Sequence, residues 1–157
     1  MKTLVAYFSA QGTTKRIAEK VQELLNCDIH EIKPETPYSG ADLNWLDRNS
    51  RSSLEMKDPD CRPPLAQREI DVSAYDTVFV AYPIWWYREP SIIDSFLDAC
   101  DLRDKKVILF ATSGGSDIGD SAKRISDLYG LQITEARRLP SRIREDELKK
   151  WLDNLGL

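Results

Sequence analysis

The stretch that decides the fold runs from a short apolar segment into a polar loop: Leu4-Val5-Ala6-Tyr7-Phe8-Ser9-Ala10-Gln11-Gly12-Thr13-Thr14. Its first five residues are continuously apolar, as expected for a strand covered on both faces of a parallel sheet. After the loop, apolar side chains recur at i, i+4, i+7 and i+8 from Ile17 to Leu25, which predicts an amphipathic helix. The stretch therefore reads as a strand–loop–helix unit.

Strand and helix signals alternate along the rest of the chain. Two further strong apolar runs and two weaker ones predict four more strands, at 77–82, 106–112, 28–32 and 131–135. Apolar residues at helical spacing lie between or after them, at 90–97, 118–129 and 145–155. This alternation is typical of βαβ units, so we predict a three-layer α/β fold with a doubly wound parallel sheet.

One segment in the middle of the chain is ambiguous. Within 40–56, Leu43 and Leu46 favour a helix, whereas 49–53 is polar. The following stretch, 57–71, contains three prolines and is expected to be a loop. Trp45 and Trp151 are interpreted as packing residues on helices.

Composition limits the classes of protein. The 157 residues, 41% apolar and 31% charged, fit one domain spanning residues 1–157 with no visible linker. Lys and Arg number 22 against 26 Asp and Glu, giving a formal net charge of −4. This balance disfavours nucleic acid and anionic membranes as partners, because both attract Lys and Arg.

Cysteine and histidine usage favours a reduced compartment. Cys27, Cys61 and Cys100 form no C-x-x-C motif, and His30 is the single histidine, so neither a disulfide framework nor a metal site is expected. The N-terminal apolar run is too short for a signal peptide, and no run of 18 apolar residues occurs. These features predict a cytoplasmic protein without a membrane partner.

The loop after the first strand has the composition of a phosphate site. Its hydroxyl, amide and glycine residues are Ser9, Gln11, Gly12, Thr13 and Thr14. Together with a helix N-terminus, they can hold an anion through neutral donors and the helix dipole. The alternative is that Ser9 or Thr13 merely caps the helix. Neither G-x-x-x-x-G-K-[ST] nor G-x-G-x-x-G is present, which excludes a P-loop and disfavours a dinucleotide fold.

Two more loops follow the strands at 77–82 and 106–112. The first, Pro83-Ile84-Trp85-Trp86-Tyr87-Arg88-Glu89, is rich in aromatic side chains, which suit a flat ligand or, alternatively, cover a helix or an interface. The second, Thr112-Ser113-Gly114-Gly115-Ser116-Asp117, offers hydroxyl donors and close backbone approach, and Ser116 or Asp117 is expected to cap the next helix. Because ligands of such sheets bind beyond the carboxyl ends of the strands, the three loops predict a mononucleotide with a large flat ring.

These motifs resemble those of the flavodoxin family: an A-Y-F-S…G-T-T-K start, a P-I-W-W loop and a T-S-G-G-S loop. The resemblance covers essentially the whole chain and implies a five-stranded sheet of order 2-1-3-4-5 that binds FMN noncovalently. It places the phosphate at Ser9, Gln11, Gly12, Thr13 and Thr14. It places the flavin ring at Pro83, Ile84, Trp85, Trp86 and Tyr87, with Thr112, Ser113, Gly114 and Gly115 at its other edge.

By this resemblance the chain is a low-potential electron carrier between redox partner proteins, a reductase and an acceptor. An apolar pocket in an acidic protein disfavours the anionic reduced flavin, which lowers its potential. The alternative is an FMN-dependent NAD(P)H oxidoreductase acting on quinones or similar small acceptors. In that case the nicotinamide phosphates would need cations, for which Arg88 or the group Arg137, Arg138, Arg142 and Arg144 is available. A non-redox interaction module is a third class, and the oligomeric state, monomer or weak dimer, is left open. Residues 40–64 either cover the flavin or dock a partner, and the sequence leaves both roles open.

Two residues depart from the family pattern. Gln11 replaces a usual Thr and can still donate a hydrogen bond. Tyr87 replaces the Gly of many relatives, and a non-Gly residue disfavours positive φ. We therefore expect the one-electron reduced flavin to be poorly stabilised, and an abundant neutral form of it in a stepwise reductive titration would contradict this.

A signalling receiver domain is disfavoured because acidic residues do not end the first and third strands, and Cys61 with Arg68 does not have phosphatase spacing.

Overall fold

The computed structural model describes residues 2–113 and 117–157. Five strands form one parallel sheet: β1 (Thr3–Tyr7), β2 (Asp28–Glu31), β3 (Thr77–Pro83), β4 (Lys106–Ser113) and β5 (Ile133–Pro140). Their order is β2-β1-β3-β4-β5, which confirms the predicted arrangement. The helices are α1 (Thr13–Leu25), α2 (Arg51–Lys57), α3 (Ser91–Ala99), α4 (Ser121–Tyr129) and α5 (Glu145–Asn154).

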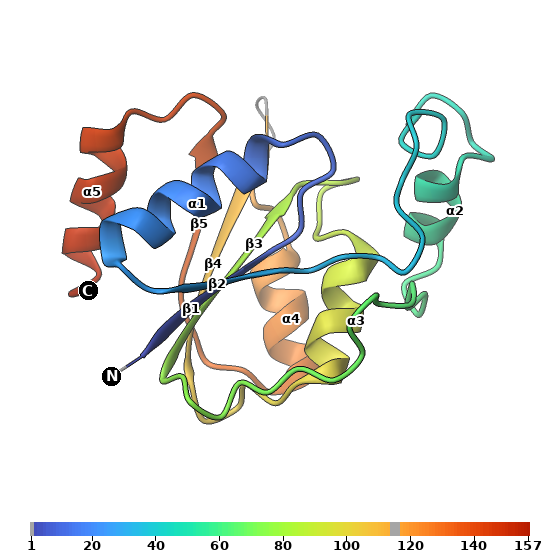
Figure 1. The fold of residues 1–157 in the computed structure, drawn as a ribbon. Coiled ribbons are helices and arrows are strands. Elements are labelled where there is room, and N and C mark those ends of the chain that lie inside the picture. Colours follow the sequence, from blue (N-terminus) through green and yellow to red (C-terminus); the bar gives the residue numbers. More distant parts are fainter. Residues whose placement is uncertain (1, 114–116) are drawn as a thin grey trace.

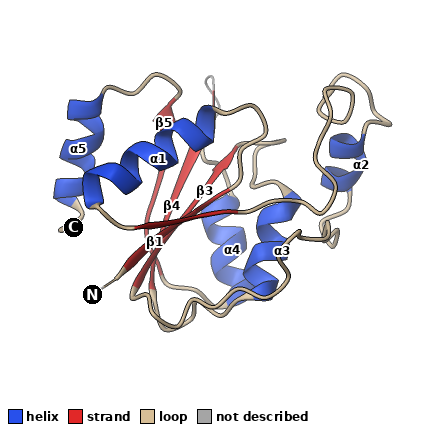
Figure 2. Cartoon of the chain, viewed as in Figure 1, coloured by secondary structure: helices blue, strands red, loops and turns tan. Residues whose placement is uncertain are grey.

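Helices cover both faces of the sheet. The helices α1 and α5 lie on one face and α3 and α4 on the other, whereas α2 lies apart from the sheet at the end of a long connection (Figures 1 and 2). Alternate strand residues face the two layers: Leu4 and Val78 pack in the cluster with α3 and α4, whereas Val5 and Phe79 pack in the cluster with α1 and α5. Both faces are therefore buried, which explains why the central strands are continuously apolar.

The registers place three loops at one edge of the sheet. Tyr7 at the end of β1 is level with Ala81 of β3, and Pro83 is level with Thr112 of β4. The pairing continues past the strand ends, since the Phe8 N–H donates to Ala81 O at 3.0 Å and the Ile84 N–H donates to Thr112 O at 3.0 Å. The loops after β1, β3 and β4 therefore leave the sheet side by side.

The predicted elements differ from the structure mainly in the second half of the sheet and around α2. The fifth strand was expected at 131–135 but runs from Ile133 to Pro140, because it is an edge strand with alternating exposure rather than a continuous apolar run. It begins with an irregularity: Val107 and Ile108 of β4 are level with Ile133 and Glu135, so one residue of β5 is passed over. The helix expected from 118 begins at Ser121.

In the ambiguous segment the helix forms on the polar residues and not around Leu43 and Leu46. Helix α2 begins after Ser50, whose side chain accepts a hydrogen bond from the Ser53 N–H. An i,i+4 ion pair joins Arg51 Nε and Glu55 Oε2 at 3.1 Å. A good cap and a favourable pair therefore outweigh the apolar spacing upstream.

Candidate functional site

A cavity of about 650 Å³ opens at the carboxyl ends of β1, β3 and β4. The predicted residues that line it are Ser9, Gln11, Thr13, Thr14, Pro83, Ile84, Trp85, Trp86, Tyr87, Thr112 and Ser113. The lining also includes Ala10, Leu43, Trp45, Ser52 and Ser141, which the sequence did not suggest. No charged side chain is among these lining residues, within the part of the chain that the structure describes. The cavity is of the size that ligand sites commonly have.

The polar end of the cavity is an uncapped helix N-terminus. Gly12 is the N-cap of α1, with φ of 92°, and no side chain caps the helix. The Ser9 Oγ instead accepts the Gly12 N–H at 3.0 Å, which shapes the loop. The alternative that Ser9 or Thr13 serves only as the cap is therefore wrong. Gly12 itself does not line the cavity. Its role is to shape the loop, because its left-handed conformation is one that L side chains rarely adopt.

A pair of threonines joins this loop to the neighbouring strand end. Thr14 is buried, and its Oγ1 lies 2.8 Å from Oγ1 of Thr112. Two hydroxyls in one such bond use only one of their two hydrogens, so the other hydrogen is available to a ligand. The side chains of the residues after β1 and at the end of β4 thus hold these two segments next to each other.

The apolar wall is formed by an aromatic turn, defined here as residues 85–88. The Trp85 N–H donates to Arg88 O at 3.0 Å, and the Arg88 N–H donates to Trp85 O at 3.1 Å. Trp86 and Tyr87 have φ values of 46° and 66°. The premise that a non-glycine residue would avoid positive φ here is therefore wrong, since two adjacent aromatic residues adopt it at a cost of roughly 1–2 kcal/mol each.

The turn conformation bears on the expected behaviour of the reduced cofactor. Positive φ at both central residues is the pattern of a type I′ turn. Rotating the central peptide would give a type II′ turn, which requires glycine at the position occupied by Trp86. The expectation that the one-electron reduced flavin is poorly stabilised stays a prediction, and its reason is now the non-glycine residue Trp86 and not the φ of Tyr87.

The three aromatic residues of the turn are used differently. The Trp85 ring meets the rings of Phe8 and Tyr38 edge to face, with centroid separations of 5.5 Å in both cases, so it anchors the turn to the loop after β1. Trp86 and Tyr87 are 43% and 76% exposed and lie at the cavity mouth. Thus the interpretation of the tryptophans as packing residues applies to Trp85, and Trp86 and Tyr87 remain accessible.

A second wall comes from the α2 segment, defined here as residues 39–57. Leu43, Trp45 and Ser52 of this segment line the cavity. Trp45 was expected to pack on a helix, but it lies in an irregular stretch before α2 and is 70% exposed. The sequence carries no clear signal for this wall, because Leu43 and Leu46 beside Trp45 favour a helix by their spacing.

The loop after β4 contributes through its first residues. Arg138 of β5 fixes Ser113, with Nε donating to Ser113 Oγ at 3.0 Å and Nη2 donating to Ser113 O at 3.1 Å. Gly114, Gly115 and Ser116 lie outside the described residues. The expected cap at Asp117 is wrong: its carboxylate accepts the adjacent Ile118 N–H, and the N-cap of α4 is Asp120 with no side-chain bond.

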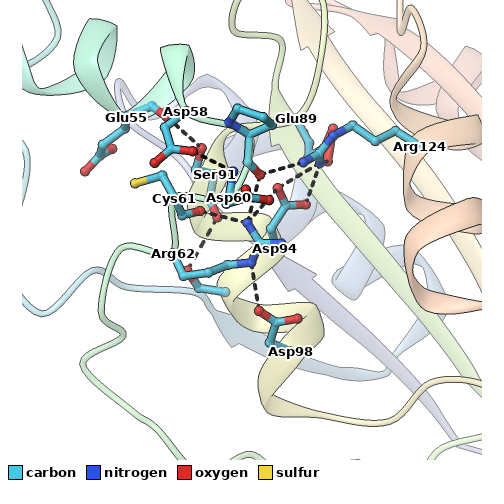
Figure 3. A network of polar contacts seen from close by, with 12 residues as sticks. Glu55, Asp58, Asp60, Cys61, Arg62, Glu89, Ser91, Asp94, Asp98 and Arg124 are labelled. Carbon is cyan, nitrogen blue, oxygen red and sulfur yellow. Dashed lines mark hydrogen bonds and ion pairs between the residues drawn. The ribbon is translucent and has the colours of Figure 1, made fainter.

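Behind the aromatic turn lies a buried cluster of charged side chains, shown in Figure 3. Glu89 and Asp94 are fully buried. Nη1 of Arg124 lies 2.5 Å from Glu89 Oε2 and 2.8 Å from Asp94 Oδ2. Burial, together with the adjacent Asp94, raises the pKa of Glu89 to about 8. Its Oε1 has no hydrogen-bond partner among the described residues, and burial without such a bond disfavours the ionised form of this carboxyl.

Clustered metal-ligating side chains and membrane-spanning helices are both absent from the described part of the chain. It contains no group of three His, Cys, Asp or Glu side chains placed to hold a metal ion. It also contains no helix long and apolar enough to cross a membrane. The cysteines are free thiols, and burial raises the pKa of Cys27 to about 11 and that of Cys100 to about 12, so both are protonated at neutral pH.

The fold and the cavity define a class: a doubly wound α/β protein with a cavity at the carboxyl ends of its strands, between a helix N-terminus and an aromatic turn. Residues 2–155 match the family model described as Flavodoxin, and the chain belongs to this family. A comparison with curated protein sequences gives no match.

Solved structures extend the comparison. A candidate flavoprotein from Bacteroides eggerthii DSM 20697 is 45% identical with a TM-score of 0.92, over 99% of this chain and 98% of that one. Another from Bacteroides uniformis ATCC 8492 is 42% identical with a TM-score of 0.93, over 97% of both chains. A flavoprotein in complex with FMN from Lactobacillus acidophilus NCFM is 25% identical with a TM-score of 0.71, over 96% of this chain and 98% of that one.

The aromatic turn depends on a close approach by Gly119. A Cβ added at Gly119 would lie 2.4 Å from the Tyr87 backbone oxygen, and Gly119 itself has φ of 66°. We expect Gly119→Ala to lower the free energy of unfolding by about 2 kcal/mol, because it adds both backbone strain and a clash. Urea unfolding measures this loss. Gly40→Ala, where no atom lies within 4 Å of the added Cβ, is the control and should stay within about 0.5 kcal/mol of the parent. Equal effects of the two changes would contradict the close approach.

Protonation of Glu89 makes stability depend on pH. Its pKa is raised in the folded chain, so folding binds a proton, and this stabilisation is present below the unfolded pKa and lost as pH rises toward about 8. The charged groups facing it are Asp94, Arg124 and Arg88, with the Tyr82 hydroxyl nearby.

We expect Glu89→Gln to flatten the decline in unfolding free energy between pH 5 and 8, where one site contributes at most about 1.4 kcal/mol per pH unit. Urea unfolding at each pH measures the slope, and Glu69→Gln at an exposed position is the control. If the slopes of Glu89→Gln and the parent coincide, the carboxyl is ionised in the folded chain.

Proposed function

We propose that this chain binds FMN noncovalently in the cavity and carries electrons at low potential between redox partner proteins, as a flavodoxin of the cytoplasm. One observation carries the proposal. The cavity combines an uncapped helix N-terminus at one end with an aromatic wall at the other, and the lining described has no charged side chain. The relative from Lactobacillus acidophilus that is solved in complex with FMN supports this choice of ligand.

The residues fit the parts of FMN. The N-terminus of α1 with Gln11 and Thr13 offers neutral donors to the phosphate, with the positive end of the helix dipole behind them. Trp86 and Tyr87 offer flat apolar surfaces to the ring, and Thr112 and Ser113 offer polar atoms at the other strand end. When bound, the flavin supplies the redox chemistry, and the chain supplies binding and orientation.

The uncharged lining favours a low potential. Reduction adds negative charge to the ring system, and the described lining places no cation beside it. The chain also has a net charge of −4, which opposes further negative charge. Both effects disfavour the anionic reduced cofactor, so the bound flavin is a strong electron donor.

The second candidate function, NAD(P)H-dependent reduction of quinones, is supported by the open aromatic mouth at Trp45 and Tyr87, which could admit a flat acceptor. None of the arginines that this function would need, Arg88, Arg137, Arg138, Arg142 and Arg144, lines the cavity. The Arg88 side chain is only 14% exposed, Arg138 holds Ser113, and Arg144 pairs with Asp146 and Glu147. Arg142 lines a separate cavity with Arg16 and Lys20. The geometry therefore favours the electron carrier.

Phosphate binding by neutral donors is tested at Thr13. We expect Thr13→Val to raise the dissociation constant for FMN about tenfold, because one hydrogen bond to a charged group is lost. Fluorescence titration of the FMN-free protein measures the constant. Lys15→Ala is the control and should change it less than about threefold, since Lys15 does not line the cavity. Riboflavin, which has no phosphate, should bind the parent and Thr13→Val equally. A parent protein that binds no FMN would overturn the proposed function.

Direct use of a nicotinamide separates the two candidate functions. We expect the FMN-loaded protein to reduce a quinone or ferricyanide from NADPH or NADH only slowly unless a separate reductase is added. The acceptor absorbance gives the rate, and the same mixture without the protein is the control. Rapid turnover by the protein alone would establish the oxidoreductase instead.

A further inference from the structure

Two walls of the cavity, the aromatic turn and the α2 segment, meet at one side chain. Arg88 is the last residue of the turn, and its guanidinium points away from the cavity into the buried cluster behind it. Arg88 is not among the residues that line the cavity. The inference below deepens the proposed function and rests on it, because it concerns how the same cavity is shaped.

The turn requires support from outside itself. Trp86 and Tyr87 both have positive φ, and strained residues of this kind persist only where the surrounding structure over-determines them. The two backbone hydrogen bonds between Trp85 and Arg88 close the turn without fixing its orientation. Tyr87 is 76% exposed, so packing of its side chain supplies little of the support.

The guanidinium of Arg88 contacts three elements. Its Nη1 donates to the Glu89 backbone oxygen at 3.0 Å, which holds the chain directly after the turn. Its Nη2 donates to Ser91 Oγ at 3.3 Å, at the start of α3, and to Met56 O at 3.4 Å, at the end of α2. Ser91 Oγ in turn donates to Glu55 O at 3.4 Å. One planar group thus joins the turn to α3 and to the last turn of α2.

The anchor of this guanidinium is Asp94 on α3. Its Oδ2 lies 3.6 Å from Nη1 of Arg88, 3.8 Å from Nη1 of Arg62 and 2.8 Å from Nη1 of Arg124. Arg62 and Arg124 also donate to the Pro59 backbone oxygen at 3.1 and 3.0 Å, so the chain that follows α2 is tied to the same carboxylate (Figure 3). A buried carboxylate with three cationic partners holds them firmly, since removing one partner of a buried pair is strongly destabilising.

We propose that Arg88 is a positioning residue for the flavin cavity: its guanidinium, held by Asp94, keeps the aromatic turn in its left-handed conformation and fixes the α2 segment beside it. The relative placement of Trp86 and Tyr87 on one wall and Leu43, Trp45 and Ser52 on the other then depends on this side chain. A role for Arg88 as a direct ligand of nicotinamide phosphates is not compatible with its burial and its four partners.

The test uses the full-length chain and replaces Arg88 with Met, which keeps the apolar stem and removes the donors. Arg103→Met is the matched control, because Arg103 is an exposed arginine that pairs with Asp101 at 2.7 Å, far from the cavity. Amide hydrogen exchange is measured without FMN over residues 39–57 and 84–89. The dissociation constant and the visible circular dichroism of bound FMN are measured on the loaded protein.

We expect Arg88→Met to exchange about tenfold faster in both segments and to bind FMN about tenfold more weakly, with an altered dichroism spectrum. Arg103→Met should match the parent in all three readouts. If Arg88→Met is folded and also matches the parent, the proposal is overturned.

Arg88→Lys keeps the test decisive if the Met variant does not fold. Lysine keeps the charge beside Asp94 but lacks the planar fork that reaches Glu89 O, Ser91 Oγ and Met56 O together. It should therefore restore the thermal stability of the parent and still show fast exchange in 39–57 and an altered dichroism spectrum. Exchange and dichroism identical to the parent would overturn the proposal. Hydrogen exchange is measured without FMN and therefore tests the role of Arg88 even if the parent protein binds no FMN. Failure of the parent to bind FMN would overturn only the proposed function.

Discussion

The parallel pairing of β1 with β3 and of β3 with β4 is the constraint on which the site depends. Parallel strands end at the same edge, and the registers here bring Tyr7 level with Ala81 and Pro83 level with Thr112. A helix N-terminus, an aromatic turn and a hydroxyl-rich strand end are therefore assembled from residues far apart in the chain. The Thr14–Thr112 hydroxyl contact at 2.8 Å fixes the spacing at the polar end. Displacing one of these strands would separate the loops that form most of the cavity lining.

Charge is separated from the cavity in a consistent way. The described lining is neutral, whereas the charged groups of the same region gather behind the aromatic turn, around Glu89 and Asp94. The charged groups behind the aromatic turn hold this turn in place through Arg88. It also keeps direct ion pairs away from the ligand. The cavity wall is thus held by charged residues while the cavity lining contains uncharged ones.

Sequence reasoning predicted the parts that local chemistry determines. The apolar runs identified the central strands, and the three loops after them contain most of the lining. The edge strand β5 was predicted too short, because alternating exposure gives a weaker signal than a continuous apolar run. For residues 40–64 the sequence left two roles open, covering the ligand or docking a partner. It did not identify Leu43, Trp45 and Ser52 as lining residues, because tertiary packing, not periodicity, places this irregular segment at the cavity. The positive φ values of Trp86 and Tyr87 were missed because local preference opposes them.

The edges of the sheet have a consequence for how the molecule behaves in a crowded solution. On one side the sheet ends in β2, which has only four residues, and on the other in β5, which has an exposed Arg137, an irregular pairing with β4 and a terminal Pro140. Short, charged, irregular and proline-ended strands are poor templates for a strand from another chain. The sheet is thereby protected from growing by edge-to-edge addition. The chain thus protects both edges through its own residues, and no second chain is needed to cover them.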